Sequence, residues 1–168
     1  WYEALAFCRW LAAKAQAQPA LLPPALQGQT NWRITLPTEW QWEKAARGHD
    51  GRQYPWGDAY QAGYTNINES WLKAGPNYLQ KTSAVGMYPH GVSPYGLLDM
   101  SGNVRERCLN EYDNPDRIQA EGDARRVVRG GSWRYFSTYA SALYRSAWNH
   151  RFNYLGFRVV VGFVVPVS

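Results

Sequence analysis

The chain has 168 residues, of which 45% are hydrophobic, 15% aromatic and 18% charged, a composition that excludes a disordered chain and suits one domain with a sizeable core. Its formal charge of +5 comes from 18 Lys and Arg residues that are scattered without a basic helix or cluster, so no nucleic-acid partner is expected. No apolar run approaches the roughly 20 residues that a membrane-spanning helix needs, so no membrane span is expected.

The first part of the chain predicts two helices separated by a loop. Residues 1–15 are good helix formers with apolar side chains on neighbouring turns, which indicates an amphipathic helix. Residues 16–32 are rich in proline, so we expect an insertion loop on the surface. Thr38, followed by Gln41 three residues later, is typical of a capping box, and a glycine at a C-cap position follows, which predicts a helix over 39–47.

The next stretch, residues 49–99, is rich in Gly, Pro, Asn, Asp and Tyr, which predicts turns rather than long elements. Long loops are compatible with a compact domain when ligands, metals or aromatic side chains hold them in place. The aromatic candidates for this role are Trp56, Trp71, Tyr78, Tyr88 and Tyr95.

The cysteines and histidines do not form a recognisable site. Cys8 lies in an apolar helical pattern and is interpreted as a small core residue rather than half of a disulfide with Cys108. His49, His90 and His150 are far apart in the sequence and lack the spacing of metal ligands, so we interpret them as surface or turn residues.

In the segment 126–160, valine-rich and glycine-containing ends flank an aromatic middle. We call these two ends the frames of the segment. Its valine pairs and triplets predict strands, and its glycines at 130, 131 and 156 indicate tight turns or a close backbone approach. Between residues 134 and 154, seven aromatic side chains alternate irregularly with Ser, Thr, Ala and Asn, with no sustained period of 2 or 3.6. This composition indicates a binding surface.

Five blocks, in order, carry a resemblance to a known family: ALAFCRWL at 4–11, RITLPTEWQWEKAARG at 33–48, YPWGD at 54–58, VGMYPHGVSPYGLLDMSGNVRERC at 85–108, and RVVRGGSW with GFRVV near the end. The chain resembles the formylglycine-generating-enzyme or sulfatase-modifying-factor domain. The resemblance implies one α+β domain over 1–168 with a C-type lectin-like fold, in which two helices accompany small twisted antiparallel sheets and much ordered loop. Relatives carry a strand region before the first helix, so an upstream domain or N-terminal fragment is also expected.

The best-known members of this family oxidise a substrate cysteine at a copper site, which the resemblance places on two cysteines shortly after the GGS turn. No cysteine follows Ser132 here, so we expect neither copper nor that activity. Another branch uses iron in a histidine-rich site that the three scattered histidines do not provide, and no GxSxG motif occurs. We expect no enzyme; the alternative is a family oxidoreductase or metal-dependent enzyme with a site of unrecognised type.

The resemblance also implies a structural calcium ion, for which hard oxygen ligands are suitable. Carried over to this sequence, its ligands are Asp99, Gly102, Val104 and Glu106. The alternative is that Asp99 caps the turn and Glu106 pairs with an arginine. A second family site would fall near Asn66 and Ile67.

Two positions beside Glu106 depart from the family. Relatives have tryptophans there, whereas this chain has Arg105 and Arg107. This exchange predicts a charged surface, or an interface with acidic groups.

Variable proteins of diversity-generating retroelements use the same fold as a display scaffold, and this chain resembles them. Adenine-directed mutagenesis of AAC codons gives NNC codons, which encode no Lys, Glu, Gln, Met or Trp. Residues 134–154 contain none of the first four, and Trp148 is the one exception, which we interpret as a fixed position. The resemblance implies a bacterial or phage-encoded protein, in the cytoplasm or at the cell surface.

We therefore expect a non-catalytic domain whose variable segment, 134–154, binds a protein, peptide or glycan. Tyr and Phe offer large contact areas with few rotatable bonds, as in antibody paratopes. The candidate contact residues are Arg134, Tyr135, Ser137, Tyr139, Ser141, Tyr144, Asn149, Phe152 and Tyr154. The alternative for each aromatic residue is burial in the core.

Overall fold

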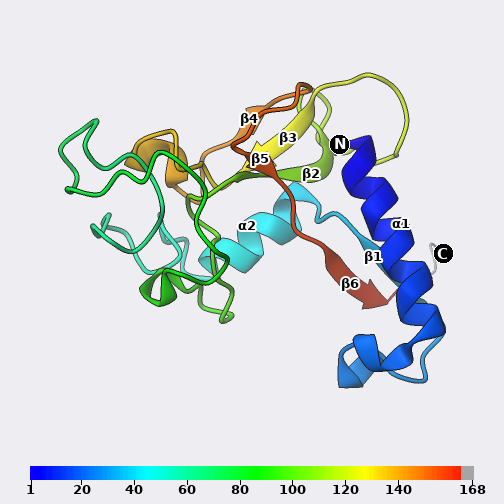
Figure 1. Cartoon of the computed structure of the whole chain (residues 1–168). Coiled ribbons are helices and arrows are strands. Elements are labelled where there is room, and N and C mark those ends of the chain that lie inside the picture. The colour runs from blue at the N-terminus through cyan, green and yellow to red at the C-terminus, as the bar shows by residue number, and fades with distance from the viewer. Residues whose placement is uncertain (164–168) are drawn as a thin grey trace.

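The computed structural model describes residues 1–163, and this range holds two α-helices and six short strands (Figure 1). The helices are α1 (Tyr2–Ala17) and α2 (Glu39–Arg47). The strands are β1 (Trp32–Thr35), β2 (Arg105–Glu111), β3 (Arg126–Arg129), β4 (Ser146–Ala147), β5 (Leu155–Gly156) and β6 (Val160–Phe163). The 3-10 turns are η1 (Pro19–Leu21), η2 (Pro24–Leu26), η3 (Pro89–Gly91) and η4 (Ser137–Ala140). Residues 164–168 of the predicted domain lie outside the described residues.

The strands form two small sheets. In one, β1 pairs antiparallel with β6, and in the other the order is β4-β3-β2-β5. β2 is antiparallel to β3 but parallel to β5, which differs from the expected antiparallel sheets. A parallel pair requires a long connection rather than a hairpin, and the chain between β2 and β5 supplies one.

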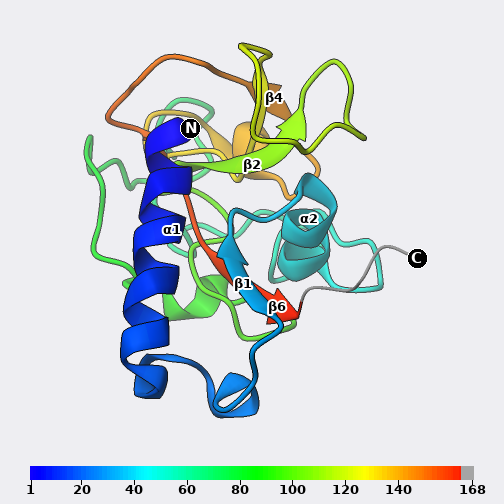
Figure 2. The ribbon, with the colours of Figure 1, turned by 90° about the vertical axis from the view of Figure 1, so that its right-hand side faces the viewer.

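Each helix packs against a sheet. α1 runs alongside β1 and β6, as Figure 2 shows, and buries Leu5 and Cys8 against Leu36 and Leu109. α2 lies against β2 and β3 and contributes Trp42, which is 1% exposed. Cys8 is a buried core residue, as predicted, and Cys108 is buried as well. Within residues 1–163, neither helix has the length and hydropathy of a membrane span.

The helix boundaries follow local chemistry. α2 occupies the predicted residues, and both hydrogen bonds of its capping box are present between Thr38 and Gln41. α1 ends two residues later than predicted, immediately before the sequence Gln18-Pro19, where proline disfavours helix in its predecessor. The predicted insertion loop is partly integrated into the core, because Leu22 and Leu26 are buried beside the end of α1.

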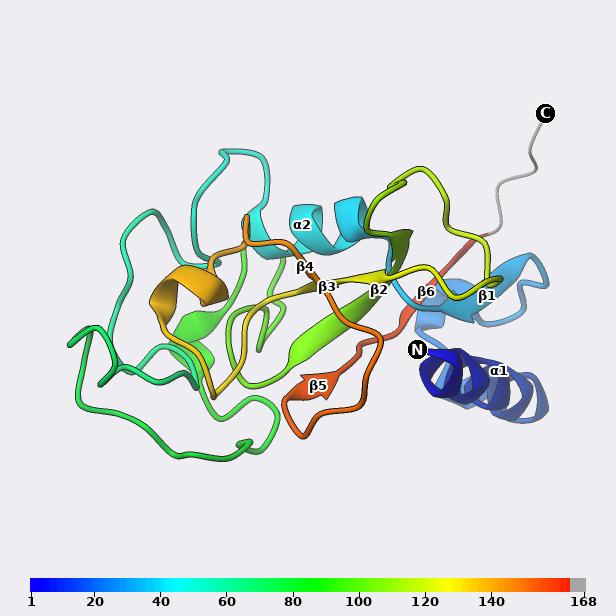
Figure 3. The same cartoon turned by 90° about the horizontal axis from the view of Figure 1, so that it is seen from above.

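Residues 49–99 form the loops expected of them and gather at the end of the molecule opposite α1 (Figure 3). Their main anchor is Glu69, a residue that the sequence analysis did not identify. Its fully buried carboxylate accepts hydrogen bonds from the Tyr60 hydroxyl (2.6 Å) and from the backbone N–H groups of Gly63 (2.7 Å) and Asn77 (3.0 Å).

The aromatic residues predicted to hold these loops divide into two groups. Trp56 does so, because its ring stacks on Tyr54 at 5.2 Å and meets Tyr64 at 5.5 Å. Trp71 and Tyr95 are 61% and 49% exposed and hold the loops only at the surface, where Trp71 contacts Phe136 at 5.6 Å and Tyr95 contacts His49 at 6.2 Å. Buried polar side chains such as Glu69 therefore hold these loops in place together with the aromatic rings.

Candidate functional site

The frames of the variable segment bring distant parts of the chain close together. Gly131 has φ of 69°, and a Cβ there would lie 2.6 Å from the Tyr139 carbonyl oxygen. A Cβ on Gly156 would lie 2.8 Å from the Val104 side chain. The close backbone approach predicted for these glycines is therefore present, and it holds η4 against the end of β3.

Between the frames, the seven aromatic side chains of the segment form one continuous group, which we call the aromatic cluster. Its members are Tyr135, Phe136, Tyr139, Tyr144, Trp148, Phe152 and Tyr154. Ring centroids of neighbours are 4.6 to 5.7 Å apart, within the range for favourable aromatic pairs. Most of these rings are half-buried, so the cluster presents faces and edges to solvent.

Arg105 lies at the centre of the aromatic cluster. It begins β2, is 3% exposed, and its backbone N–H donates to the Tyr154 carbonyl (2.9 Å). Its guanidinium carbon is 4.4 Å from the ring centroid of Tyr135, and the rings of Tyr139, Tyr144 and Trp148 follow at 5.6 to 5.9 Å. Burial lowers the pKa of this guanidinium, but arginine stays charged in proteins.

The nine predicted contact residues differ in exposure. Exposed or half-buried are Arg134, Tyr135, Ser137, Tyr139, Tyr144, Asn149 and Phe152. Ser141 and Tyr154 are 5% and 6% exposed, which corrects their assignment as contact residues. The Ser141 hydroxyl donates to the Gln53 carbonyl (3.2 Å), and the Tyr154 ring stacks beneath Phe152. Both therefore support the surface from below.

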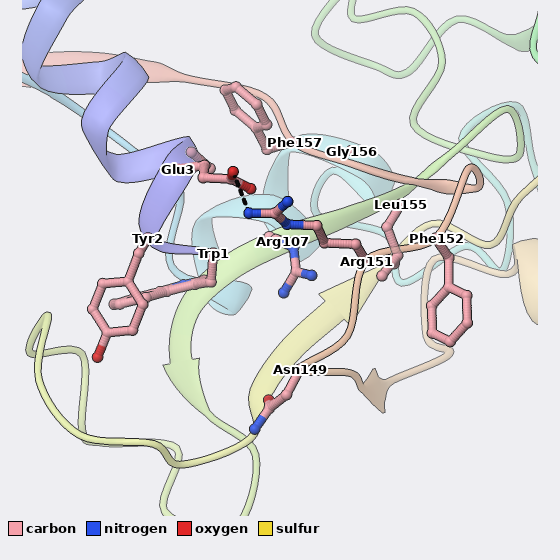
Figure 4. A pocket seen from close by; sticks show the side chains of 11 residues that line it. Trp1, Tyr2, Glu3, Arg107, Asn149, Arg151, Phe152, Leu155, Gly156 and Phe157 are labelled. Atoms are coloured by element: carbon pink, nitrogen blue, oxygen red, sulfur yellow. Dashed lines mark hydrogen bonds and ion pairs between the residues drawn. The ribbon is translucent and has the colours of Figure 1, made fainter.

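Asn149 and Phe152 also line a groove of about 380 Å³ between the start of α1 and the chain from 149 to 157 (Figure 4). Arg107, which is 6% exposed, reaches into this groove and donates to the carbonyls of Trp148 (3.1 Å) and His150 (2.9 Å). At the rim, Arg151 pairs with Glu3 (2.5 Å).

Of the two alternatives predicted at Arg105 and Arg107, the charged surface is wrong for residues 1–163, whereas the interface with acidic groups stays a prediction. Both side chains are buried, and no carboxylate lies within 4 Å of either among residues 1–163. The signal that was present in the sequence is the loss of two family tryptophans. The burial itself depends on rings that come from residues more than 25 positions away.

The predicted calcium ligands lie around one tight turn, but their donor atoms do not fit calcium as they are arranged. Glu106 accepts hydrogen bonds from Arg158 on both carboxylate oxygens (2.5 and 2.6 Å) and one from Trp42 (2.6 Å). Asp99 accepts from the Gly86 N–H (2.7 Å) in a neighbouring loop, so it does not cap its own turn as the alternative expected, whereas the expected pairing of Glu106 with an arginine is present. A guanidinium thus balances the Glu106 charge, and calcium binding stays a prediction.

The other polar residues of this region build the turn. At the second predicted site, Asn66 donates to the Lys81 carbonyl (3.0 Å), while its own backbone carbonyl accepts from the Asn103 N–H (2.8 Å). His49, His90 and His150 are exposed, and residues 1–163 contain no group of three or more His, Cys, Asp or Glu side chains placed to hold a metal ion.

The profile of the sulfatase-modifying factor enzyme 1-like domain matches residues 1–163. The chain belongs to this family. It is 33% identical over 143 residues to the inactive C-alpha-formylglycine-generating enzyme 2 of Bos taurus, covering 79% of this chain and 36% of that protein. It is 32% identical over 134 residues to hercynine oxygenase of Mycolicibacterium thermoresistibile, covering 68% and 28%. The sulfatase-modifying-factor-like domain described here thus spans well under half of these curated relatives.

Solved structures confirm the expected fold class. Variable protein 1 of Treponema denticola superposes with a TM-score of 0.60 at 27% identity, covering 77% of this chain and 47% of that one. PvdO from Pseudomonas aeruginosa gives a TM-score of 0.67 at 22% identity, covering 96% and 59%. The domain therefore has the α+β fold of formylglycine-generating enzymes and C-type lectin-like variable proteins.

Proposed function

We propose that this domain is a non-catalytic binding module and that the aromatic cluster is its contact surface for a protein, peptide or glycan. The observation that carries the proposal is the convergence of seven aromatic rings from 134–154 on one half-exposed site, in a segment without cysteine. Function is argued from this site, because the fold alone is shared by enzymes and binding proteins.

The proposal requires a rigid backbone and surface side chains that can be exchanged without loss of the fold. All residues of β2 and β3 beneath the cluster are buried, so the backbone that carries the rings is held by the core. Side-chain changes at the surface then alter recognition with little loss of order, which limits the entropy that binding costs. Similarity to a protein named as variable, and to one named as inactive, supports this proposal.

The proposal is tested by a display library. Randomising Arg134, Ser137, Tyr139, Tyr144 and Phe152 on phage and selecting against one soluble protein is expected to yield folded binders. A control library of equal size in the exposed loop 76–82 is expected to yield fewer. Equal yields from both libraries, or unfolded clones from the first, would overturn the proposal.

The retroelement origin has its own test in the genome. A reverse-transcriptase gene and a near-copy of the coding stretch for 134–154 are expected beside this gene, with differences confined to adenine positions. Without such a template repeat, the segment would be a fixed binding surface rather than a diversified one.

An enzymatic function is the second candidate, because relatives of this chain include proteins named as formylglycine-generating enzymes and hercynine oxygenases. Incubation with copper, oxygen and a cysteine-containing peptide discriminates between the two. We expect no conversion of the peptide cysteine to an aldehyde above the level of a protein-free control, since the segment after Ser132 has no cysteine to hold copper. Turnover that depends on the metal would exclude the binding module as the sole function.

A further inference from the structure

Arg105 is a buried cation that has no counter-ion within residues 1–163. Its side chain makes no hydrogen bond in the described chain, and its Nε is a buried donor without a partner. An isolated buried charge is unfavourable unless it is paired, and a missing hydrogen bond leaves the desolvation of the donor uncompensated. The nearby aromatic faces offset part of this cost by cation–π attraction, but they accept no strong hydrogen bond.

A second unsatisfied donor belongs to the same cluster. The indole N–H of Trp148 is buried and has no hydrogen-bond partner among residues 1–163, and the Trp148 ring is one of the four around the Arg105 guanidinium. Native proteins leave few buried donors unpaired, and such groups often mark a place that a ligand or water fills. Two of them in one cluster favour an acceptor-rich ligand group.

The charges around the aromatic cluster also favour a negatively charged ligand group. Residues 134–154 contain no Asp or Glu, whereas they contain three arginines. Arg145 is neutralised by Glu39 (2.6 Å) and Arg151 by Glu3 (2.5 Å). Arg134, which is exposed and lies 5.7 Å from the Tyr154 ring centroid, has no carboxylate within 4 Å among residues 1–163. Among the described residues, Arg134 therefore adds a positive charge without a carboxylate partner to the surface of the aromatic cluster.

We propose that Arg105 makes this surface selective for carboxylate groups, and that its ligand is an acidic segment of a protein. This inference rests on the binding function proposed above. A carboxylate matches the planar fork of a guanidinium and accepts two hydrogen bonds at once. Because Arg105 lies on β2, outside the variable segment, the preference persists whichever side chains occupy residues 134–154.

The rings that cover Arg105 also suit this ligand. They are half-buried rather than enclosed in the core, so a carboxylate reaches the guanidinium by displacing ring edges and not by opening the sheet. Flat aromatic walls accommodate the flat carboxylate and the peptide groups that carry it.

The test uses a labelled oligoglutamate peptide, an oligoglutamine peptide of equal length and dextran sulfate, measured by fluorescence anisotropy or competition at physiological salt. Three variants each remove one positive charge: Arg105→Met, Arg134→Met and Arg33→Met. Arg33 is exposed on β1 in the other sheet and serves as the matched control. Non-specific attraction to the basic protein predicts equal losses from all three variants.

We expect oligoglutamate to bind and oligoglutamine not to bind. Arg105→Met is expected to weaken oligoglutamate binding about 10-fold or more, because a charge-assisted hydrogen bond is lost. Arg134→Met is expected to weaken it about 3-fold or less, and Arg33→Met not measurably. Equal losses from all variants would overturn the inference, as would tighter binding of dextran sulfate than of oligoglutamate.

An NMR measurement on the wild-type protein covers the case in which Arg105→Met does not fold. Adding sodium glutarate is expected to shift the ¹⁵Nε resonance of Arg105 more than that of Arg33. Equal shifts would overturn the inference. If the display library yields binders while glutarate and oligoglutamate leave Arg105 unaffected, the binding function stands and only the carboxylate preference fails.

Discussion

Two adjacent residues of β2 show how differently this domain handles a buried charge. Glu106 is surrounded by donors, with Arg158 on both carboxylate oxygens and the Trp42 indole on one. In the described part of the chain, the Arg105 side chain contacts aromatic faces and no hydrogen-bond acceptor. The first arrangement is that of a structural residue, and the second is that of a residue whose partner comes from outside.

Substitutions at these two positions are therefore expected to have opposite effects on stability. Glu106→Gln leaves Arg158 without its counter-ion and should lower the free energy of unfolding by about 3–5 kcal/mol. Arg105→Met removes an unpaired charge and should leave that free energy unchanged or raise it. Urea denaturation followed by tryptophan fluorescence measures both. A large loss of stability in Arg105→Met would mean that its cation–π contacts support the fold.

The Glu106–Arg158 pair also determines what calcium should do. Because the guanidinium already neutralises the carboxylate, we expect the melting temperature to be the same in EDTA and in excess calcium chloride. Differential scanning calorimetry of the wild-type protein checks this expectation. A rise in melting temperature with calcium that Asp99→Asn abolishes would instead establish the calcium site that the family resemblance implies.

At the scale of elements, α2 is the part of the fold that its own residues define most completely. Its N-terminus carries a reciprocal capping box, and its last turn carries Lys44 and Arg47, which suit the negative end of the helix. Thr38→Ala is expected to lower the free energy of unfolding by about 1 kcal/mol, because one helix N–H loses its acceptor. Thr30→Ala, in an exposed loop, is the control with no expected change.

The contrast between α2 and β5 explains how much of the structure the sequence predicts. Capping, turn and helix-forming residues act over a few positions, so both helices and the loops of 49–99 follow from local patterns. The parallel pairing of β5 and the burial of Arg105 depend on contacts between distant segments, for which local patterns carry no signal. The family resemblance predicted the fold. The burial of the Arg105 guanidinium beneath the aromatic cluster is visible only in the structure.

Within the variable segment, the rings of Phe152 and Tyr154 stack on each other. We expect Phe152 to contact the ligand and Tyr154 to support the surface from below. Phe152 is 38% exposed and Tyr154 is 6% exposed. Phe152→Ser is expected to change the free energy of unfolding by less than about 1 kcal/mol, whereas Tyr154→Ser should lower it by about 3 kcal/mol, because it leaves a cavity. Thermal unfolding of the two variants tests this division, and equal losses would show that position 152 belongs to the frame.

At the scale of the whole molecule, the two sheets and their helices occupy one end and the loops of 49–99 the other, with the variable segment crossing the second sheet between them (Figure 1). The last strand of the described chain, β6, pairs with β1 from residues 32–35. The segment's frames at β3 and β5 are thus parts of the same sheet, with β2 between them. This arrangement supports the proposal that side chains of 134–154 change without displacing the elements that hold them.

Native-state hydrogen exchange should reveal the same division. The amides of β2 and β3 are expected to exchange most slowly, because every residue of both strands is buried and the two strands are paired. Amides of the exposed loop 76–82 should exchange fastest, and those of 134–154 should lie between the two. Mass spectrometry of peptic fragments resolves the three regions. If β2 and β3 exchanged as rapidly as 76–82, the aromatic cluster would stand on a mobile base, and a binding surface that tolerates diversity would lose its physical foundation.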